Sequence, residues 1–151
     1  MRAVVQRVSR AQVSVAGTTI GSIGLGLVVL VAMEEGDGEA DVDALAAKLV
    51  DLRIFADQGG LMNRSLRDVG GQALVISQFT LAADLRRGRR PSFTRAAPPA
   101  VAASLVQRLV ERIRSNGLAV AVGHFGSHME VELVNDGPVT LVIEVREGRI
   151  S

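Results

Sequence analysis

Apolar and polar positions alternate near the start of the chain, which is typical of a long β-strand with one buried face. The alternating positions are Val4, Gln6, Val8, Val13 and Val15. Ala16-Gly17 predicts a turn, so Thr18 to Ile23 is expected to pair back on the first strand as a hairpin. The apolar run from Leu27 to Met33 predicts a further strand of the buried type.

Two later segments repeat apolar side chains at helical spacing. Residues 39 to 53 predict a first helix, whose apolar stripe consists of Val42, Leu45, Ala46, Leu49 and Leu52. Pro98-Pro99 is expected to open a second helix, and Asn116-Gly117 is expected to cap its end. The second stripe consists of Val101, Leu105, Leu109 and Ile113.

The remaining apolar runs predict strands. Ala73 to Leu81 is one strand, and it leads into a long arginine-rich loop over residues 82 to 97. Three strands are expected near the end of the chain: Leu118 to Gly123, Met129 to Val134 and Val139 to Val145. The order of strands, helix, strand, helix and strands predicts one mixed α/β domain, α+β-like, over residues 1-151, with the helices packed on one side.

Composition narrows the class of protein. The chain has 151 residues, 48% of them hydrophobic, which is enough to build a core. The longest apolar run is too short to cross a bilayer, and charged residues interrupt the first seven positions before a signal-peptide segment can form. The chain has no cysteine, which excludes disulfides, a thiol nucleophile and a thiolate metal site. These features predict a soluble, cytoplasmic protein that does not associate with membranes.

The net charge of +1 does not by itself indicate a nucleic-acid partner. Lys48 is the only lysine, and the other sixteen basic residues are arginines, a bias that high genomic GC content would also produce. Five arginines fall within ten residues: Arg86, Arg87, Arg89, Arg90 and Arg95. Guanidinium groups match the geometry of phosphate, so the cluster is either a phosphate-binding loop or a solvated loop.

The sequence does not support several common functional motifs, namely a dinucleotide fingerprint, a metal site and a catalytic triad. The glycine-rich segment Gly21 to Gly26 has the wrong order for a dinucleotide fingerprint and leads into a strand rather than a helix. His124 and His128 are the only histidines, and no helix or carboxylate pattern near them favours a metal site. Neither histidine has a G-x-S-x-G partner, so a Ser-His-Asp triad is not indicated. No metal or cofactor is expected.

The segment Ser77-Gln78-Phe79-Thr80-Leu81 ends a hydrophobic strand just before the arginine-rich loop. Strand ends beside long loops often carry functional groups. Thr80 could act as a nucleophile, but it would need an adjacent base, and none is evident. Gln78, Thr80 and backbone N–H groups could instead bind an oxyanion or position water. The alternative is that the polar side chains form the solvent face of a half-buried strand.

The segment Asn135-Asp136-Gly137-Pro138 separates the last two predicted strands. Such residues can reverse the chain, and proline is excluded from the middle of a sheet. An ordinary turn is one interpretation. The other is a site made of main-chain atoms, because Pro138 directly after Gly137 fixes a φ angle and directs both carbonyl groups.

Together the two segments Ser77–Leu81 and Asn135–Thr140 resemble the signature motifs of the D-aminoacyl-tRNA deacylases. Further segments match in the same order, so the resemblance extends from Met1 to about Val145. They are Gln6–Val8, Arg53–Phe55, Met62-Asn63, Gly88–Phe93 and Phe125–Met129. Phe79 favours the D-selective branch over a related branch with a trans Gly-Pro bond. The chain departs from the family pattern at Ser127, where alanine is common, and around the basic residues Arg64 and Arg67.

The resemblance implies a layered α/β/β fold with barrel-like mixed or antiparallel sheets and two main helices. It implies hydrolysis of the ester in tRNA charged with a D-amino acid or glycine. It also implies a homodimer whose active site lies at the subunit interface, where a cis Gly137–Pro138 pair from one subunit enters the partner's pocket. The two carbonyl groups would reject an L side chain, whereas glycine has no side chain to reject.

The resemblance also assigns individual roles. The catalytic group would comprise Gln78, the Phe79 backbone N–H and Thr80, and Arg7 would hold the Gly-Pro loop. The expected substrate-binding residues are Ser77, Phe93, Met129, Gly137 and Pro138. The expected tRNA phosphate-binding residues are Arg86, Arg87, Arg89 and Arg90. The tail Arg146 to Ser151 lies beyond the resemblance and is expected to add nothing catalytic.

Two questions remain open at the level of sequence. The first is whether Thr80 attacks the ester or only positions groups while the 2′-OH of the terminal ribose helps to activate water. The second is the class of function, because an RNA-binding module without catalysis and a small-ester hydrolase independent of tRNA are both alternatives. The scarcity of aromatic residues, with four Phe, no Tyr and no Trp, disfavours the RNA-binding module.

Overall fold

Strand β1 (Arg2–Val15) is the centre of the sheet, because it pairs antiparallel with three other strands. The computed structural model describes residues 1–86 and 88–151. The partners of β1 are β2 (Thr18–Ile23), β3 (Gly26–Ala32) and β8 (Glu130–Arg146). On the far side of β3, strands β6 (Gln72–Ser77) and β7 (Val120–Val122) add in parallel, which makes the sheet mixed.

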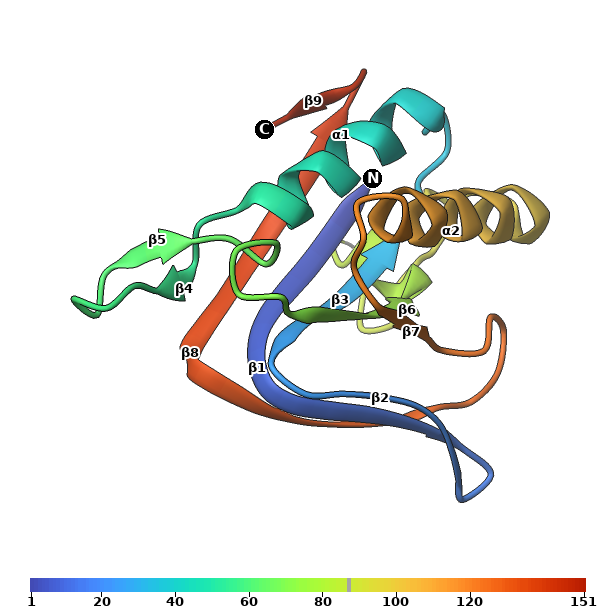
Figure 1. The fold of residues 1–151 in the computed structure, drawn as a ribbon. Coiled ribbons are helices and arrows are strands. Elements are labelled where there is room, and N and C mark those ends of the chain that lie inside the picture. The colour runs from blue at the N-terminus through green and yellow to red at the C-terminus, as the bar shows by residue number, and fades with distance from the viewer. Residues whose placement is uncertain (87) are drawn as a thin grey trace.

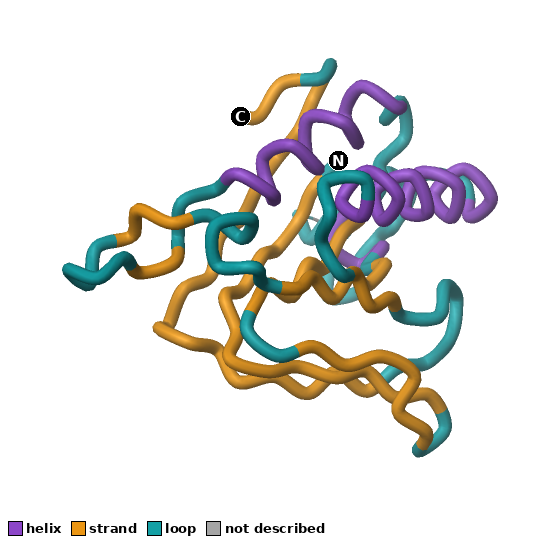
Figure 2. The backbone as a smooth tube through the Cα atoms, viewed as in Figure 1, coloured by secondary structure: helices purple, strands orange, loops and turns teal. Residues whose placement is uncertain are grey.

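Both helices, α1 (Glu39–Asp51) and α2 (Pro99–Arg114), cover the same face of this sheet (Figure 1). The distal half of β1, β2 and the first half of β8 curl away beneath β3 and β6 (Figure 2). One core cluster lies between the helices and the sheet, and a second lies inside the curl around Val8, Val28 and Leu74. The expectation of a layered, barrel-like mixed α/β fold with two main helices is confirmed.

Smaller elements complete the fold. Strands β4 (Phe55–Ala56) and β5 (Met62–Arg64) form a separate hairpin, and β9 (Arg149–Ile150) pairs with the end of β8. A short 3-10 helix, η1 (Phe79–Ala82), follows β6. No helix in residues 1–86 or 88–151 is long and apolar enough to span a membrane.

The predicted β1–β2 hairpin and both predicted helices are present. Ala16 and Gly17 form the turn with φ angles of 49° and 78°. Helix α2 begins with a proline in its first turn, where the missing N–H costs no hydrogen bond. Its buried stripe includes Leu105, Leu109 and Ile113, whereas Val101 is 46% exposed, so the prediction was wrong for Val101.

The predicted division of residues 129–145 into two strands is wrong. Strand β8 is continuous, and both of its halves pair with β1 in the same antiparallel direction. The register passes from Gln6 opposite Thr140 to Val8 opposite Asn135, so the four residues after Asn135 bulge out opposite Arg7. The polar segment therefore does not reverse the chain, because the ladder to β1 resumes on both sides of it.

The predicted strand Ala73–Leu81 ends earlier than expected. β6 stops at Ser77, where its parallel ladder with β3 ends at Val31. The Gln78 N–H still donates to the Val31 carbonyl at 2.8 Å, and the chain then turns into η1. The alternative in which these polar residues form the solvent face of a strand therefore does not hold for Thr80, which lies in η1.

An ion-pair cluster joins the two helices. The Asp43 carboxylate of α1 accepts hydrogen bonds from Arg112 Nε at 2.7 Å and from Arg108 Nε at 3.0 Å. Arg108 also pairs with Glu39 at 2.9 Å. The hydrogen bonds from Arg112 and then Arg108 hold the pKa of the Asp43 carboxyl well below its usual range.

Replacing Asp43 by asparagine is expected to lower the free energy of unfolding by about 0.5–1 kcal/mol at pH 7. Because folding depresses the pKa of Asp43, its stabilisation is present above the ordinary aspartate pKa of about 4 and is lost as the pH falls through the folded value. Urea unfolding at several pH values should show the two proteins converging in acid. Asp51→Asn, at the exposed pair with Arg67, is the control with a smaller effect. A difference that stays constant down to pH 2 would contradict this account.

Candidate active site

A cavity of about 520 Å³ lies at the end of β6, between η1, the start of α2 and the turn after β7. Four of the expected substrate-binding or catalytic residues line it: Ser77, Phe79, Phe93 and Met129. The other lining residues are Met33, Ala96, Ala97, Pro98, Pro99, Ala102, Phe125, Gly126 and Ser127. The structure therefore brings together residues that lie more than fifty positions apart in the sequence.

Backbone pairing around the arginine-rich segment places Phe93 at this cavity. Asp84 and Ser92 exchange two backbone hydrogen bonds, of 2.7 and 3.1 Å, which close the base of the segment. Its return path is fixed to the end of β3, because the Ala97 N–H donates to the Met33 carbonyl at 2.9 Å. The ring of Phe93 meets that of Phe79 edge to face, with centroids 5.0 Å apart.

Met129 reaches the cavity because position 123 is glycine. A Cβ atom at Gly123 would lie 2.7 Å from the Met129 sulfur and 3.1 Å from Ile76. Any larger side chain there would displace Met129 from the cavity wall. Gly123 is thus part of the packing that shapes the site.

The three groups expected to be catalytic lie together beside the cavity. Gln78 Nε2 donates to Thr80 Oγ1 at 2.5 Å, and both side chains are at least partly accessible. In the described part of the chain, no hydrogen-bond acceptor is found for the Phe79 N–H, as is usual at the start of a helical turn. Only Phe79 of these three lines the cavity itself. The arrangement offers one amide N–H and two side-chain polar groups to a bound ester.

Only part of the arginine cluster is free to bind phosphate in the described residues. Asp84 forms a close ion pair with Arg86, with Arg86 Nε 2.9 Å from Oδ1, and this bond holds the pKa of the Asp84 carboxyl well below its usual range. Arg89 and Arg90 are exposed. Arg87 lies outside the described residues.

The Gly137–Pro138 pair is exposed on the bulge of β8, and its peptide bond is cis, as the resemblance implies. Arg7 Nε donates to the Asp136 carbonyl at 2.9 Å, and another nitrogen of Arg7 donates to the Ile54 carbonyl. Asn135 closes the bulge, because its amide donates to the carbonyls of Arg7 and Val139, both at 2.9 Å. The bulge is therefore hydrogen-bonded to both β1 and the segment before β4.

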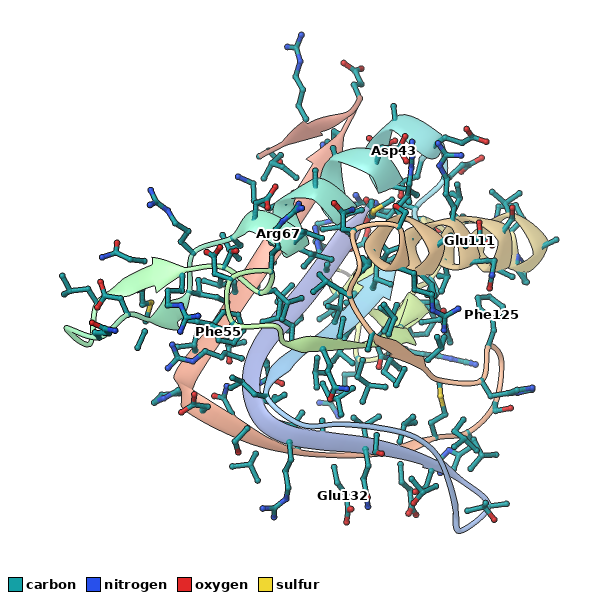
Figure 3. The ribbon with its side chains drawn as sticks, in the orientation of Figure 1. Asp43, Phe55, Arg67, Glu111, Phe125 and Glu132 are labelled. Atoms are coloured by element: carbon teal, nitrogen blue, oxygen red, sulfur yellow. The ribbon has the colours of Figure 1, made fainter. Side chains whose placement is uncertain are left out.

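Within one chain the bulge and the cavity are far apart. Ile54, which Arg7 links to the bulge, adjoins Phe55, and Phe55 lies on the opposite side of the molecule from Phe125 of the cavity (Figure 3). No residue between 135 and 140 lines the cavity. A single chain therefore does not combine the two signature motifs in one site.

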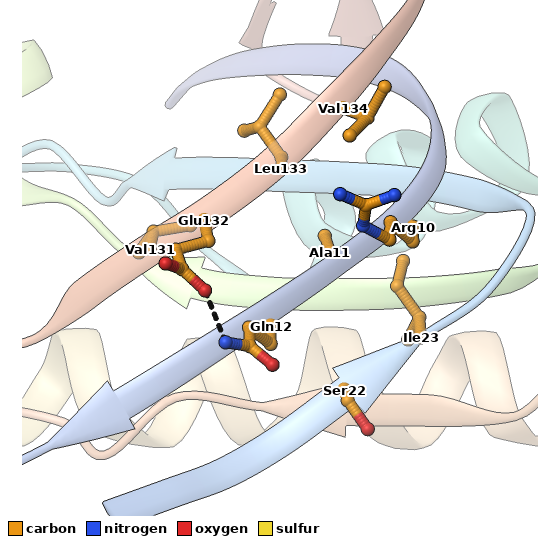
Figure 4. A pocket seen from close by; sticks show the side chains of 9 residues that line it. All are labelled: Arg10, Ala11, Gln12, Ser22, Ile23, Val131, Glu132, Leu133 and Val134. Carbon is orange, nitrogen blue, oxygen red and sulfur yellow. Dashed lines mark hydrogen bonds between the residues drawn. The ribbon is translucent and has the colours of Figure 1, made fainter. Parts of the chain in front are cut away.

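A larger cavity, of about 700 Å³, lies at the curled part of the sheet between β1, β2 and β8 (Figure 4). It contains none of the expected site residues, and its polar lining includes a hydrogen bond from Gln12 to Glu132. In the described residues no group of three or more His, Asp or Glu side chains is arranged to hold a metal ion. The cavity at the end of β6 remains the candidate active site.

Sequence reasoning assigned no role to several residues of this cavity. The segment Phe125–Met129 resembles the family, but the resemblance predicts a function only for Met129. Phe125, Gly126 and Ser127 also line the cavity. The available signal in the sequence was a phenylalanine directly before a glycine, in a chain with four phenylalanines.

Two solved structures share this fold. One, titled "c-Myc DNA Unwinding Element Binding Protein", is 36% identical with a TM-score of 0.89, covering 95% of this chain and 98% of that chain. The other, titled "Structural Analysis of a probable eukaryotic D-amino acid tRNA deacylase", has a TM-score of 0.79 at 18% identity, covering 93% and 97%. The fold is thus shared with these two proteins, one of which is titled as a probable D-amino acid tRNA deacylase.

Sequence comparison identifies the family. The family model "D-Tyr-tRNA(Tyr) deacylase" matches residues 4–144. The protein named D-aminoacyl-tRNA deacylase of Heliobacterium modesticaldum is 58% identical over 148 residues, which is 98% of this chain and 99% of that protein. The protein of the same name from Thermomicrobium roseum is 55% identical, covering 99% and 97%. The chain belongs to the D-Tyr-tRNA(Tyr) deacylase family.

Proposed function

We propose that this protein hydrolyses the ester that joins a D-amino acid to the 3′ end of tRNA, and that it rejects L-aminoacyl-tRNA. The proposal rests on one observation, which is that Ser77, Phe79, Phe93 and Met129 line one cavity beside the Gln78–Thr80 pair in a chain of this family. Free amino acid and intact tRNA are the products. Glycyl-tRNA is a second substrate, and the enzyme thereby removes mischarged tRNA before translation uses it.

The ester carbonyl is placed at the start of η1 in this proposal. The Phe79 N–H donates to the oxygen that becomes negative during attack, as an oxyanion-hole donor does. Gln78 and Thr80 position the attacking water, and the 2′-OH of the terminal ribose helps to activate it. Aromatic side chains of the cavity hold the terminal nucleoside. No metal or cofactor takes part.

The chiral filter comes from a second copy of the chain. The support for this step is that Gly137 and Pro138 are exposed and lie away from the cavity of their own chain. In a two-fold dimer each subunit places its pair in the partner's cavity, so both sites form together. The carbonyl oxygens of the pair then leave no room for an L side chain at the α-carbon, whereas a D side chain points away.

Further residues support binding. Arg7 holds the Gly-Pro bulge through its bonds to Asp136 and Ile54. The exposed Arg89 and Arg90 contact tRNA phosphates, together with Arg86 after exchange of its Asp84 partner, and with Arg87, which lies outside the described residues. We place the reaction in the cytoplasm, where tRNA is charged.

The purified protein should hydrolyse D-tyrosyl-tRNA at least 100-fold faster than L-tyrosyl-tRNA, because a steric clash excludes the L side chain. Release of labelled amino acid at equal substrate concentrations measures both rates, and glycyl-tRNA should behave like the D substrate. A free D-amino acid ester is the control, and equal turnover of that ester would indicate a small-ester hydrolase. Tight, salt-dependent tRNA binding without turnover would indicate an RNA-binding module. Equal D and L rates would contradict the filter.

A further inference from the structure

Ser127 and His124 form a hydroxyl–imidazole pair at the wall of the candidate active site. Ser127 Oγ lies 2.6 Å from His124 Nδ1, and Ser127 lines the cavity. The Ser127 N–H also donates to the His124 carbonyl at 3.1 Å, which closes a turn through Gly126 at a φ of 78°. The turn therefore fixes the two side chains relative to each other and to the cavity.

The pair stands out because the rest of the cavity is almost entirely apolar. Of the described residues that line it, only Ser77 and Ser127 have polar side chains. Ser77 ends β6, beside the groups to which the proposed function assigns the ester. Ser127 is thus the polar side chain that remains for another part of the substrate. A polar group that enters such a cavity without a hydrogen-bond partner would lose binding free energy.

His124 determines what the Ser127 hydroxyl can offer. A neutral imidazole with its proton on Nε2 has an acceptor lone pair on Nδ1. In that tautomer Ser127 donates its single proton to His124, and the lone pairs of Oγ are left for the cavity. Ser127 then accepts a hydrogen bond from the substrate rather than donating one.

We propose that Ser127 Oγ accepts a hydrogen bond from the N6 amino group of the terminal adenosine, and that His124 is the positioning residue for this contact. The inference rests on the proposed function. The rings of Phe79, Phe93 and Phe125 suit a planar base, because aromatic side chains stack on bases. The amino group is the hydrogen-bond donor on the edge of adenine, and all tRNAs end in adenosine.

A substrate that lacks the N6 amino group tests the contact directly. D-aminoacyl-tRNA ending in adenosine is compared with the same tRNA ending in purine riboside. For the unmodified protein, purine riboside should raise KM about 3- to 10-fold with kcat unchanged, as expected for one lost hydrogen bond. Ser127→Ala should raise KM by the same factor for the adenosine substrate and should not distinguish the two substrates.

Variants of His124 separate positioning from folding. His124→Phe removes the acceptor and should reproduce part of the Ser127→Ala effect, with no further loss in the double variant. His124→Gln keeps an acceptor and should restore KM towards that of the unmodified protein. His128→Phe is the matched control, because His128 does not line the cavity, and it should leave KM unchanged.

Several results would overturn the inference. Additive losses for Ser127→Ala and purine riboside would mean that Ser127 serves another group, such as a ribose hydroxyl. A lower melting temperature with equal losses on both substrates would mean that the pair only braces the turn.

If the unmodified protein does not hydrolyse D-aminoacyl-tRNA, the proposed function fails, and the dissociation constants of adenosine and purine riboside still decide the role of Ser127. Equal affinities would overturn it, and a preference for adenosine that Ser127→Ala removes would support it.

Discussion

Replacing Gly137 by alanine is expected to reduce hydrolysis of D-tyrosyl-tRNA about 100-fold, the scale of loss when a positioning element moves by about 1 Å. A Cβ atom at this position would lie 2.3 Å from the Val139 backbone nitrogen and 2.9 Å from Val139 Cγ2. The first contact is with backbone, so the bulge itself must shift. Val139 is buried and cannot move away without disturbing the core, so Gly137 and Pro138 move instead.

The displaced carbonyl groups would no longer fit a partner's cavity. The measurement is kcat/KM for D- and L-tyrosyl-tRNA, together with the oligomeric state from sedimentation. Gly38→Ala is the matched control, because a Cβ atom at Gly38 meets nothing within 4 Å, and its activity should be unchanged. Gly137 is exposed, so the variant should remain folded. A folded Gly137→Ala protein with full rate and full D selectivity would contradict the proposed filter.

The bulge also illustrates what the sequence could not reveal. The residues Asn135 to Pro138 have turn chemistry, and the structure places a bulge there rather than a strand boundary. The prediction of two strands was wrong because the direction of the chain after the bulge depends on β1. β1 is remote in sequence, and it pairs with β8 on both sides of Arg7.

The helices were predictable because their signals are local. The 3.6-residue spacing of apolar side chains and the proline in the first turn of α2 act within the segment itself. The end of β6 is different, because Ser77 is the last residue paired with β3 in the ladder, and among the described residues only the Gln78 N–H bonds to that strand beyond it. The pattern of apolar and polar residues after Ser77 does not indicate where pairing with β3 ends, so the end of β6 could not be predicted from it.

The candidate site depends both on local sequence signals and on contacts between segments that are distant in the sequence. Ser77 to Thr80 were found because motif and chemistry lie in one short segment. The contact between Phe79 and Phe93 depends on the Asp84–Ser92 pairing, which brings a distant segment back over η1. The His124–Ser127 pair is local, but its position at the cavity is set by the pairing of β7 with β6. The reactive groups of the site could therefore be predicted from the sequence, whereas the walls of the cavity around them could not.

Removing the 2′-OH of the terminal ribose is expected to lower kcat about 10²- to 10³-fold, the range of a lost general acid–base group. Thr80→Val is expected to cost less than about 10-fold, since Thr80 would lose only a positioning hydrogen bond. The physical reason is the environment of Thr80. Its Oγ1 accepts from Gln78 Nε2, and in the described part of the chain no carboxylate or imidazole hydrogen-bonds to it. A threonine hydroxyl without a base is a weak nucleophile.

The two effects are compared in single-turnover hydrolysis of D-aminoacyl-tRNA ending in adenosine or 2′-deoxyadenosine. Thr18→Val, in the β1–β2 hairpin, is the control for loss of a threonine hydroxyl elsewhere. Near-complete loss in a folded Thr80→Val protein, with full activity on the deoxy substrate, would assign the attack to Thr80. A small loss in Thr80→Val, together with a large loss on the deoxy substrate, would mean that the substrate supplies the group that activates water. Gln78, the Phe79 N–H and Thr80 then need only hold ester and water in place, because an aminoacyl ester is labile and positioning alone lowers the barrier to its hydrolysis.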